Sequence, residues 1–160
     1  MTGELFLKHS TTKLAQMTRY IDACLQKLDD RQVWHRSNPT QNSIGNLVLH
    51  LSGNVRQWIG SSIGGQPDIR NRDHEFSSRQ SPDLLPILKT TVSEAIEILE
   101  NLPLARLTES VTTQDGDRSM IEVIYQVVGH FQQHTGQIIF ATKLLTGEDL
   151  NFYASPKKSS

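Results

Sequence analysis

The sequence has little of several features that would direct it to other functions. One of its 160 residues is cysteine, Cys24, so no internal disulfide can form. Its apolar neighbours predict a small buried side chain in a reducing compartment. No run approaches the ~18 apolar residues of a membrane span, and residues 1–8 lack the basic and apolar regions of a signal peptide. These absences predict a cytoplasmic protein with no membrane partner.

The charge is small and dispersed. Sixteen Lys and Arg residues against 17 Asp and Glu residues give a formal net charge of −1. A nucleic-acid surface needs clustered cations to displace counterions from phosphates, so a nucleic-acid partner is not expected. A chain of this length can bury most of its apolar surface as one domain and needs neither a disulfide nor a metal simply to fold.

Helical periodicity covers most of the chain. In the first segment, residues 4–31, apolar residues fall three, four or seven apart, as one buried stripe requires. The second segment runs from Ser43 to Gly64 with the same pattern, and its interior glycine, Gly53, weakens the helix slightly. These two segments predict long amphipathic helices.

Two further helices are marked by their ends. The third opens with Ser81–Asp83, an N-cap followed by a proline and an acid, and runs to Asn101. The fourth begins with a capping box of Ser119 and Glu122 and closes at Gly147. No strand pattern competes with them, apart from a short turn at residues 115–117.

Four helices of this length predict an all-α four-helix bundle. The connection over residues 64–81 can span ~50 Å when extended, more than the ~30 Å length of a 20-residue helix. This long crossover allows the second and third helices to run parallel. We expect residues 1–150 to form a single domain and residues 151–160 a polar, disordered tail.

Three histidines carry the functional prediction. His130 and His134, spaced i and i+4, lie on one helix face about one turn apart, so two nitrogens can reach one cation. His50 falls at a corresponding flank position on the second helix. Three neutral imidazoles leave the charge of a divalent metal uncompensated and a position open, as in catalytic zinc sites. The alternative is that the histidines are packed or hydrogen-bonded, but two adjacent desolvated imidazoles need a cation or another partner.

Other polar residues have weaker functional cases. Helical spacing places four of them near the predicted ligands, so they are candidates for lining a substrate cleft. The alternative for each is a solvated or structural role. These residues are Asn54, Gln57, Gln133 and Gln137. Three further histidines, His9, His35 and His74, are minor candidates. His74 lies in the charged run of residues 70–75, which is expected to be solvated. No catalytic residue or general base follows from the sequence.

Two stretches resemble the DinB/YfiT-like superfamily of metalloenzymes, in particular its small bacterial proteins of unknown function. They are WHRSNPTQNSIGNLVLHLSGNVRQWI (Trp34–Ile59) and GHFQQHTGQIIFATKLLTGEDL (Gly129–Leu150), about 48 of the 160 residues. That superfamily carries one histidine on the second helix and H-x-x-x-H on the last, which bind a divalent metal. The matching positions are His50, His130 and His134. The resemblance also implies a bundle with a long crossover after the second helix, and frequent homodimers.

The resemblance further implies metal-dependent transfer or isomerisation chemistry with low-molecular-weight thiols. A divalent cation deprotonates a coordinated thiol and holds the thiolate for attack on an electrophile. The sequence therefore favours a thiol S-transferase that acts on a small-molecule substrate. A metal-hydroxide hydrolase and a non-catalytic dimeric bundle that binds a metal or ligand remain open. Imidazole suits nickel, zinc, iron and manganese, so the metal stays undetermined.

Overall fold

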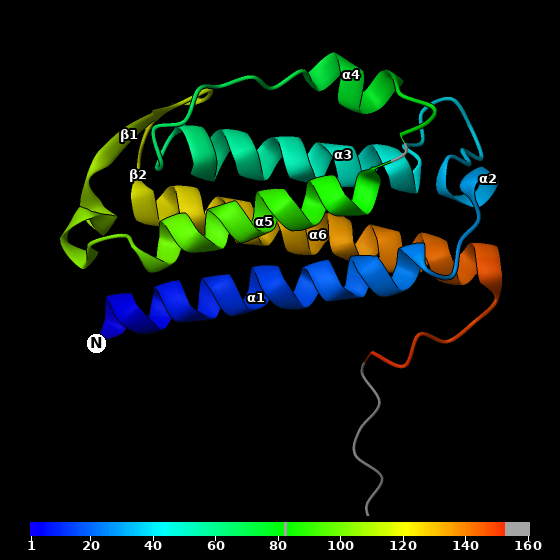
Figure 1. Ribbon diagram of the computed structural model, residues 1–160, viewed down its shortest axis with the longest axis horizontal. Coiled ribbons are helices and arrows are strands. Elements are labelled where there is room, and N and C mark those ends of the chain that lie inside the picture. The colour runs from blue at the N-terminus through cyan, green and yellow to red at the C-terminus, as the bar shows by residue number, and fades with distance from the viewer. Residues whose placement is uncertain (82, 153–160) are drawn as a thin grey trace, which may run out of the picture.

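Four long helices form half of the protein. The computed structural model describes residues 1–81 and 83–152, and within these the long helices are α1 (Thr2–Leu25), α3 (Ile44–Val55), α5 (Leu84–Glu100) and α6 (Met120–Thr146). Figure 1 shows them side by side, with α1 and α6 running in one direction and α3 and α5 in the other. Both α1 and α3 pack against α5 and α6. The four helices thus enclose one core.

That core is filled by the apolar stripes predicted from the sequence. Each long helix contributes side chains with almost no exposure, among them Leu14, Ile21, Leu51, Leu88, Ile124 and Phe131. The single cysteine, Cys24, is buried with them as predicted. Because these side chains come from all four helices, the core does not depend on the histidines for its apolar contacts.

Shorter elements join the long helices. They are α2 (Asp30–Val33), the π-helical turn η1 (Arg56–Ser61), which continues α3, α4 (Arg72–Ser77), the 3-10 turn η2 (Leu104–Thr108), β1 (Ser110–Thr113) and β2 (Gly116–Ser119). The two strands pair antiparallel, with Ser110 opposite Ser119 and Thr113 opposite Gly116. The prediction of an all-α chain was therefore wrong in this detail. Gly116 has a φ of +99°, which glycine adopts without strain, so the predicted turn becomes a hairpin.

The helix ends agree with the sequence where a local capping signal is complete. At the start of α6, Ser119 and Glu122 form the predicted capping box, and Gly147 ends the helix in the left-handed conformation, with a φ of 71°. The predicted first helix over residues 4–31 was too long. Asp29 accepts a hydrogen bond from the backbone of Gln32 at 2.8 Å and starts the separate helix α2.

The start of α5 also differs from the prediction. Asp83 takes the N-cap position and the helix begins at Leu84, so Ser81 lies before it. Pro82 lies outside the described residues. The shift shortens the helix by two residues, and its buried stripe runs from Leu84 to Leu99.

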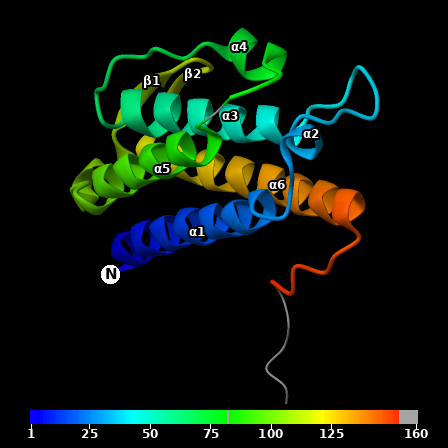
Figure 2. The same cartoon turned by 45° about the vertical axis from the view of Figure 1, so that its right-hand side comes forward.

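The chain between η1 and α5 crosses the whole length of α3. Figures 1 and 2 show it leaving the end of η1, returning along the outer side of α3 and forming α4 before it turns toward α5. Buried Asn46, on α3, holds this segment because its side-chain amide donates to the backbone oxygens of Glu75 at 2.9 Å and Ser78 at 3.0 Å. The crossing places α4 directly over α3.

The ordered chain extends past the predicted domain end at residue 150. The ring of Phe152 stacks on Tyr20 of α1, with 4.3 Å between the ring centroids. Residue 152 is therefore packed rather than part of a disordered tail, and residues 153–160 lie outside the described part of the chain. In the described part, no helix is both long and apolar enough for a membrane crossing.

Candidate metal centre

The three predicted histidines meet between α3 and α6. The Nε2 atom of His130 lies 3.1 Å from Nε2 of His50 and 3.1 Å from Nε2 of His134. The nitrogens available as ligands from the three residues lie within 4.8 Å of one another. His50 is buried, with 6% exposure, while the other two are half-buried. Residues 80 positions apart in the sequence thus form one cluster.

The spacing of these nitrogens fits a single metal ion. Two imidazole nitrogens bound to one zinc ion at about 2.0 to 2.1 Å stand about 3.0 Å apart at a right angle and about 3.4 Å apart at the tetrahedral angle. The two observed separations of 3.1 Å fall in this range. Among the described residues no hydrogen-bond partner reaches the buried Nδ1 of His130. The cluster's hydrogen bonds therefore leave this imidazole incompletely satisfied.

Two of the imidazoles are held in the tautomer that metal binding requires. Nδ1 of His50 donates to the Glu75 carboxylate at 2.9 Å, and Nδ1 of His134 donates to the side-chain oxygen of Gln137 at 2.6 Å. With its proton on Nδ1, each neutral ring has its lone pair on Nε2, the atom that faces the cluster. Oxygen acceptors behind metal-binding histidines orient and polarise the rings in this way.

The acceptor behind His50 is a buried acid. Glu75 is 5% exposed, and its second oxygen accepts from Nε of Arg70 at 2.8 Å. Burial raises the pKa of Glu75, but hydrogen bonds from His50 and Arg70 outweigh it and hold the pKa below its ordinary value. The carboxylate lies on the Nδ1 side of the ring, away from Nε2. Glu75 therefore positions His50 and does not complete the ligand set.

Room for this carboxylate comes from Gly53 on α3. A Cβ atom at residue 53 would overlap Oε1 of Glu75 and stand 3.3 Å from Nε of Arg70. A larger residue there would have to displace the acid from its buried position. The glycine that weakened the predicted helix is thus explained by the close approach of the crossing chain.

The guanidinium of Arg70 is itself fixed by the π-helical turn. Its Nη1 donates to Oε1 of Gln57 at 2.8 Å, and the amide nitrogen of Gln57 donates to Asp68 at 2.8 Å. A π-turn shifts the following side chains around the helix relative to α-helical geometry, and such turns often occur at functional sites. Here η1 supplies Gln57 to the hydrogen-bonded chain that leads through Arg70 and Glu75 to His50.

The environment favours the neutral form of His130 and His134. Burial is the largest cause that lowers the pKa of His130 to about 4, and the adjacent His134 and His50 lower it further. Burial also lowers the pKa of His134, against the opposing effect of its hydrogen bond with Gln137. Neutral imidazole is the form that binds metals, so burial keeps His130 and His134 in the binding form to a lower pH than the ordinary histidine pKa of about 6.5 would allow.

The four predicted cleft residues occupy different surroundings. Gln57 and Gln137 are hydrogen-bonded to the site as described, and Gln133 is exposed on α6. Asn54 is buried, and its Oδ1 has no hydrogen-bond partner among the described residues. Contact of these residues with a substrate stays a prediction. The prediction of a solvated run at residues 70–75 was wrong for the side chains of Arg70 and Glu75. Both side chains are buried, because they pair with each other and Glu75 is also hydrogen-bonded to His50 of α3.

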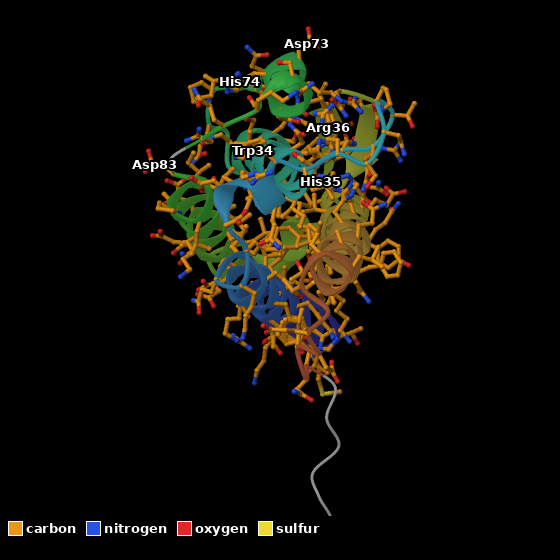
Figure 3. The ribbon with its side chains drawn as sticks, turned by 90° about the vertical axis from the view of Figure 1, so that its right-hand side faces the viewer. Trp34, His35, Arg36, Asp73, His74 and Asp83 are labelled. Carbon is orange, nitrogen blue, oxygen red and sulfur yellow. The ribbon has the colours of Figure 1, made fainter. Side chains whose placement is uncertain are left out.

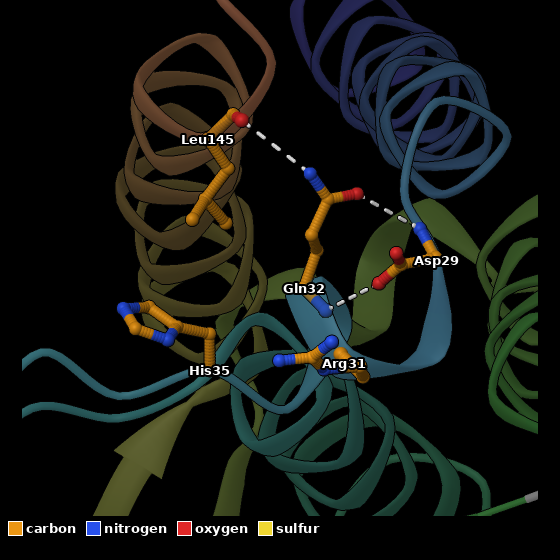
Figure 4. A pocket seen from close by; sticks show the side chains of 5 residues that line it. All are labelled: Asp29, Arg31, Gln32, His35 and Leu145. Atoms are coloured by element: carbon orange, nitrogen blue, oxygen red, sulfur yellow. Dashed lines mark hydrogen bonds between the residues drawn. The ribbon is translucent and has the colours of Figure 1, made fainter.

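The remaining histidines lie outside the cluster. Figure 3 shows His74 on α4 and His35 after α2, apart from each other at one end of the molecule. His35 lines a separate pocket of about 200 Å³ together with Asp29, Arg31, Gln32 and Leu145 (Figure 4). In that pocket Gln32 donates to the backbone oxygen of Leu145 at 3.4 Å, which ties α2 to the end of α6.

The fold is similar to that of a DinB-like protein. The crystal structure of YjoA, a DinB-like protein from Bacillus subtilis, is similar with a TM-score of 0.70 and 15% sequence identity, over 94% of this chain and 99% of that chain. Over residues 1–159 the chain matches the family described as "Protein of unknown function (DUF1572)", and it belongs to that family. No curated protein matches it. The predicted DinB-like fold is confirmed, and at this identity the YjoA structure informs the fold alone.

The first prediction concerns the gap at Gly53. We expect Gly53→Ala to lower the free energy of unfolding by about 1–3 kcal/mol, although alanine favours helix, because Glu75 must leave its partners. Ser93→Ala, at an exposed position of α5, is the control and should change stability by less than about 0.5 kcal/mol. Urea denaturation followed by circular dichroism measures both. Equal stability of Gly53→Ala and the wild type would contradict the role given to Gly53.

The second prediction is a pH dependence of the metal-free protein. The pKa of His130 is about 4 in the folded chain and about 6.5 as a free side chain, so the unfolded state binds more protons between these values. The stability that neutral His130 provides is complete above pH 6.5 and falls as the pH is lowered toward 4. Chelator-treated protein should be less stable at pH 5 than at pH 7, by up to about 1.4 kcal/mol per pH unit. His130→Gln should reduce the dependence; an unchanged slope would contradict this account.

Proposed function

We propose that this protein binds one divalent metal ion through His50, His130 and His134 and uses it to activate a low-molecular-weight thiol for transfer to a small electrophilic substrate. The observation that carries the proposal is that Nε2 of His130 lies 3.1 Å from Nε2 of both His50 and His134, with the ligand nitrogens of all three within 4.8 Å of one another. The hydrogen bonds of His50 with Glu75 and of His134 with Gln137 support it, because they place both lone pairs toward the same point.

The charge of the site favours an anionic ligand. Three neutral imidazoles leave both positive charges of the ion uncompensated, and Arg70 and Arg72 lie near enough to lower the pKa of His130. When bound, a divalent cation lowers the pKa of a coordinated thiol or water and so supplies a nucleophile at neutral pH. The Glu75 carboxylate offsets part of this positive charge from behind His50 and holds that ring in place. The helices therefore provide a fixed, electropositive binding position for a thiolate.

We also infer that α1, α3, α5 and α6 form a four-helix bundle of the DinB/YfiT-like type, with residues 62–81 as part of the crossover between the second and third long helices. The similarity to YjoA supports this assignment. In such a bundle, side chains from facing helices form metal sites in the core. The crossover here adds Arg70 and Glu75 behind one ligand.

The third prediction is that the wild-type chain retains one equivalent of Ni²⁺ or Zn²⁺ after dialysis, measured by elemental analysis. The triple variant His50→Ala, His130→Ala, His134→Ala should retain none, because all three ligand nitrogens are removed. His74→Ala is the matched control, since His74 lies outside the cluster, and should bind as the wild type does.

Circular dichroism of the same samples tests whether the fold needs the metal. The chelated wild type and the triple variant should keep their helical spectra, because the apolar core is formed by residues of all four long helices. Equal metal content in wild type and triple variant would refute the site. Unfolding on chelation would make the metal structural and refute the proposed activity.

The fourth prediction tests the thiol. Protein loaded with Co²⁺ or Ni²⁺ is titrated with glutathione, bacillithiol and mycothiol, and at least one should produce a thiolate-to-metal charge-transfer band. The same thiol is then assayed with a reactive electrophile, where the sulfur–carbon bond forms as the leaving group departs with its electron pair. The wild type should exceed His50→Ala in conjugation rate.

The outcomes of this titration separate the candidate functions. A charge-transfer band without turnover would indicate a metal- and thiol-binding module rather than a transferase. If no thiol changes the metal spectrum and rates equal those of the metal-free control, the transferase proposal fails, and ester or amide hydrolysis by the metal-loaded protein becomes the activity to assay.

A further inference from the structure

The short helix α4 presents one face to the histidine cluster. Arg72, Glu75 and Phe76 are spaced three and four residues apart, so they lie on the same side of this six-residue helix. Glu75 is hydrogen-bonded to His50 of α3, which turns this side toward the cluster. Figure 3 shows Asp73 on the outer side of α4, away from α3. The crossing chain therefore brings an arginine and a phenylalanine to the site together with the buried acid.

The ring of Phe76 lies directly against the imidazole of His50. The two ring centroids are 4.8 Å apart, and the ring planes are tilted by 38°. Phe76 is half-buried, so it contacts His50 without being enclosed. Glu75 fixes the Nδ1 edge of the imidazole, while Phe76 covers part of its surface. Phe76 therefore forms part of the wall of the site.

Arg72 lies against Phe76 in turn. Its guanidinium carbon stands 5.9 Å from the centroid of the Phe76 ring, within the range of a cation–π contact. The side chain is exposed, and in the described part of the chain no ion pair or hydrogen bond uses its N–H groups. Its charge still reaches the cluster, because it contributes to lowering the pKa of His130. Arg72 therefore offers unoccupied donors beside the histidines.

The nearby Arg70 is fully engaged and cannot serve in the same way. Its guanidinium donates from Nε and Nη2 to Glu75 and from Nη1 to Gln57, at 2.8 to 3.0 Å. Its side chain is 4% exposed, and the buried carboxylate of Glu75 depends on these bonds. The two arginines thus differ in role: Arg70 holds the site together, whereas Arg72 is available to a ligand.

A guanidinium beside a metal-bound thiolate favours a carboxylate on the same thiol molecule. Its planar N–H groups match the two oxygens of a carboxylate. An exposed ion pair alone contributes little, up to about fivefold in affinity, so Arg72 does not hold a free anion firmly. A thiol that is bound to the metal through its sulfur keeps its own carboxylate at a high local concentration near Arg72. Arg72 is thus suited to choosing between thiols.

We propose that Arg72 selects the thiol, and that the ligand class of the site is a low-molecular-weight thiol that carries a carboxylate. This inference rests on the proposed function, because the sulfur of the thiol must be bound to the metal. Phe76 holds the guanidinium beside the cluster, and Arg72 acts on the bound ligand without coordinating the ion. Glutathione and bacillithiol belong to this class, whereas mycothiol has no carboxylate.

Titration of the full, Co²⁺-loaded chain with glutathione and with glutathione diethyl ester tests the selection, because the ester lacks both carboxylates. The charge-transfer band gives each dissociation constant. We expect Arg72→Gln to raise the dissociation constant of glutathione about three- to fivefold and that of the ester by less than about twofold. Arg72→Lys keeps the charge but loses the planar fork, so its effect should be smaller. High NaCl should reduce the preference of the wild type for glutathione, because an exposed charge pair is screened.

Arg19→Gln is the matched control. It removes one positive charge from an exposed position of α1, which lies on the far side of the four long helices from α4 (Figure 1). Both dissociation constants should stay within about twofold of the wild-type values, because distant exposed charges are screened. Elemental analysis should find the same cobalt content in Arg72→Gln as in the wild type, since this arginine is not a ligand. Circular dichroism should show unchanged helical content, since the side chain is exposed.

The titration separates failure of this inference from failure of the proposed function. If Arg72→Gln weakens glutathione and its ester equally, or weakens glutathione no more than Arg19→Gln does, thiol binding stands and the role of Arg72 is overturned. Loss of cobalt from Arg72→Gln would make this residue structural and would also overturn its role. If neither thiol changes the metal spectrum of the wild type, the thiol function itself fails, and the selection of the thiol fails with it.

Discussion

The buried carboxylate of Glu75 is the group on which the site depends. A charge at 5% exposure is costly unless it is paired and hydrogen-bonded, and here Arg70 and His50 supply both conditions. The pairing is possible because Gly53 leaves room on α3 and because Asn46 holds the backbone of α4 at Glu75 and, just after the helix, at Ser78. One acid therefore couples the crossing chain, the surface of α3 and the orientation of His50.

The helix α6 has two faces with different chemistry. Its inner flank carries His130 and His134, whose burial lowers their pKa and leaves them neutral beside His50. Its outer face carries exposed apolar residues and two glycines that no neighbour explains. Both faces belong to one helix of 27 residues. A contact on the outer face would therefore be made by the same helix that carries His130 and His134.

Local signals predicted most of the helical structure. The capping box at Ser119 and the left-handed Gly147 placed both ends of α6 correctly, since each depends on residues within one turn. The prediction was less accurate where the apolar periodicity continued across a break between two helices. The apolar pattern continues past Leu25, but the chain turns there and Asp29 caps a second helix. The hairpin of β1 and β2 was reduced to a turn because its strands are four residues each and mostly exposed.

The sequence by itself determined the helical class, the DinB-like fold and the three histidines that meet. Periodicity and the i, i+4 spacing are properties of one helix, and a matching flank position was enough to select His50. Only the tertiary structure decided the groups behind the ligands. Glu75 is 25 residues from His50 in a charged run that resembles a solvated loop, and its burial follows from how the crossing chain packs on Gly53 and Asn46. Contacts of this kind depend on the relative placement of whole elements, which no local pattern encodes.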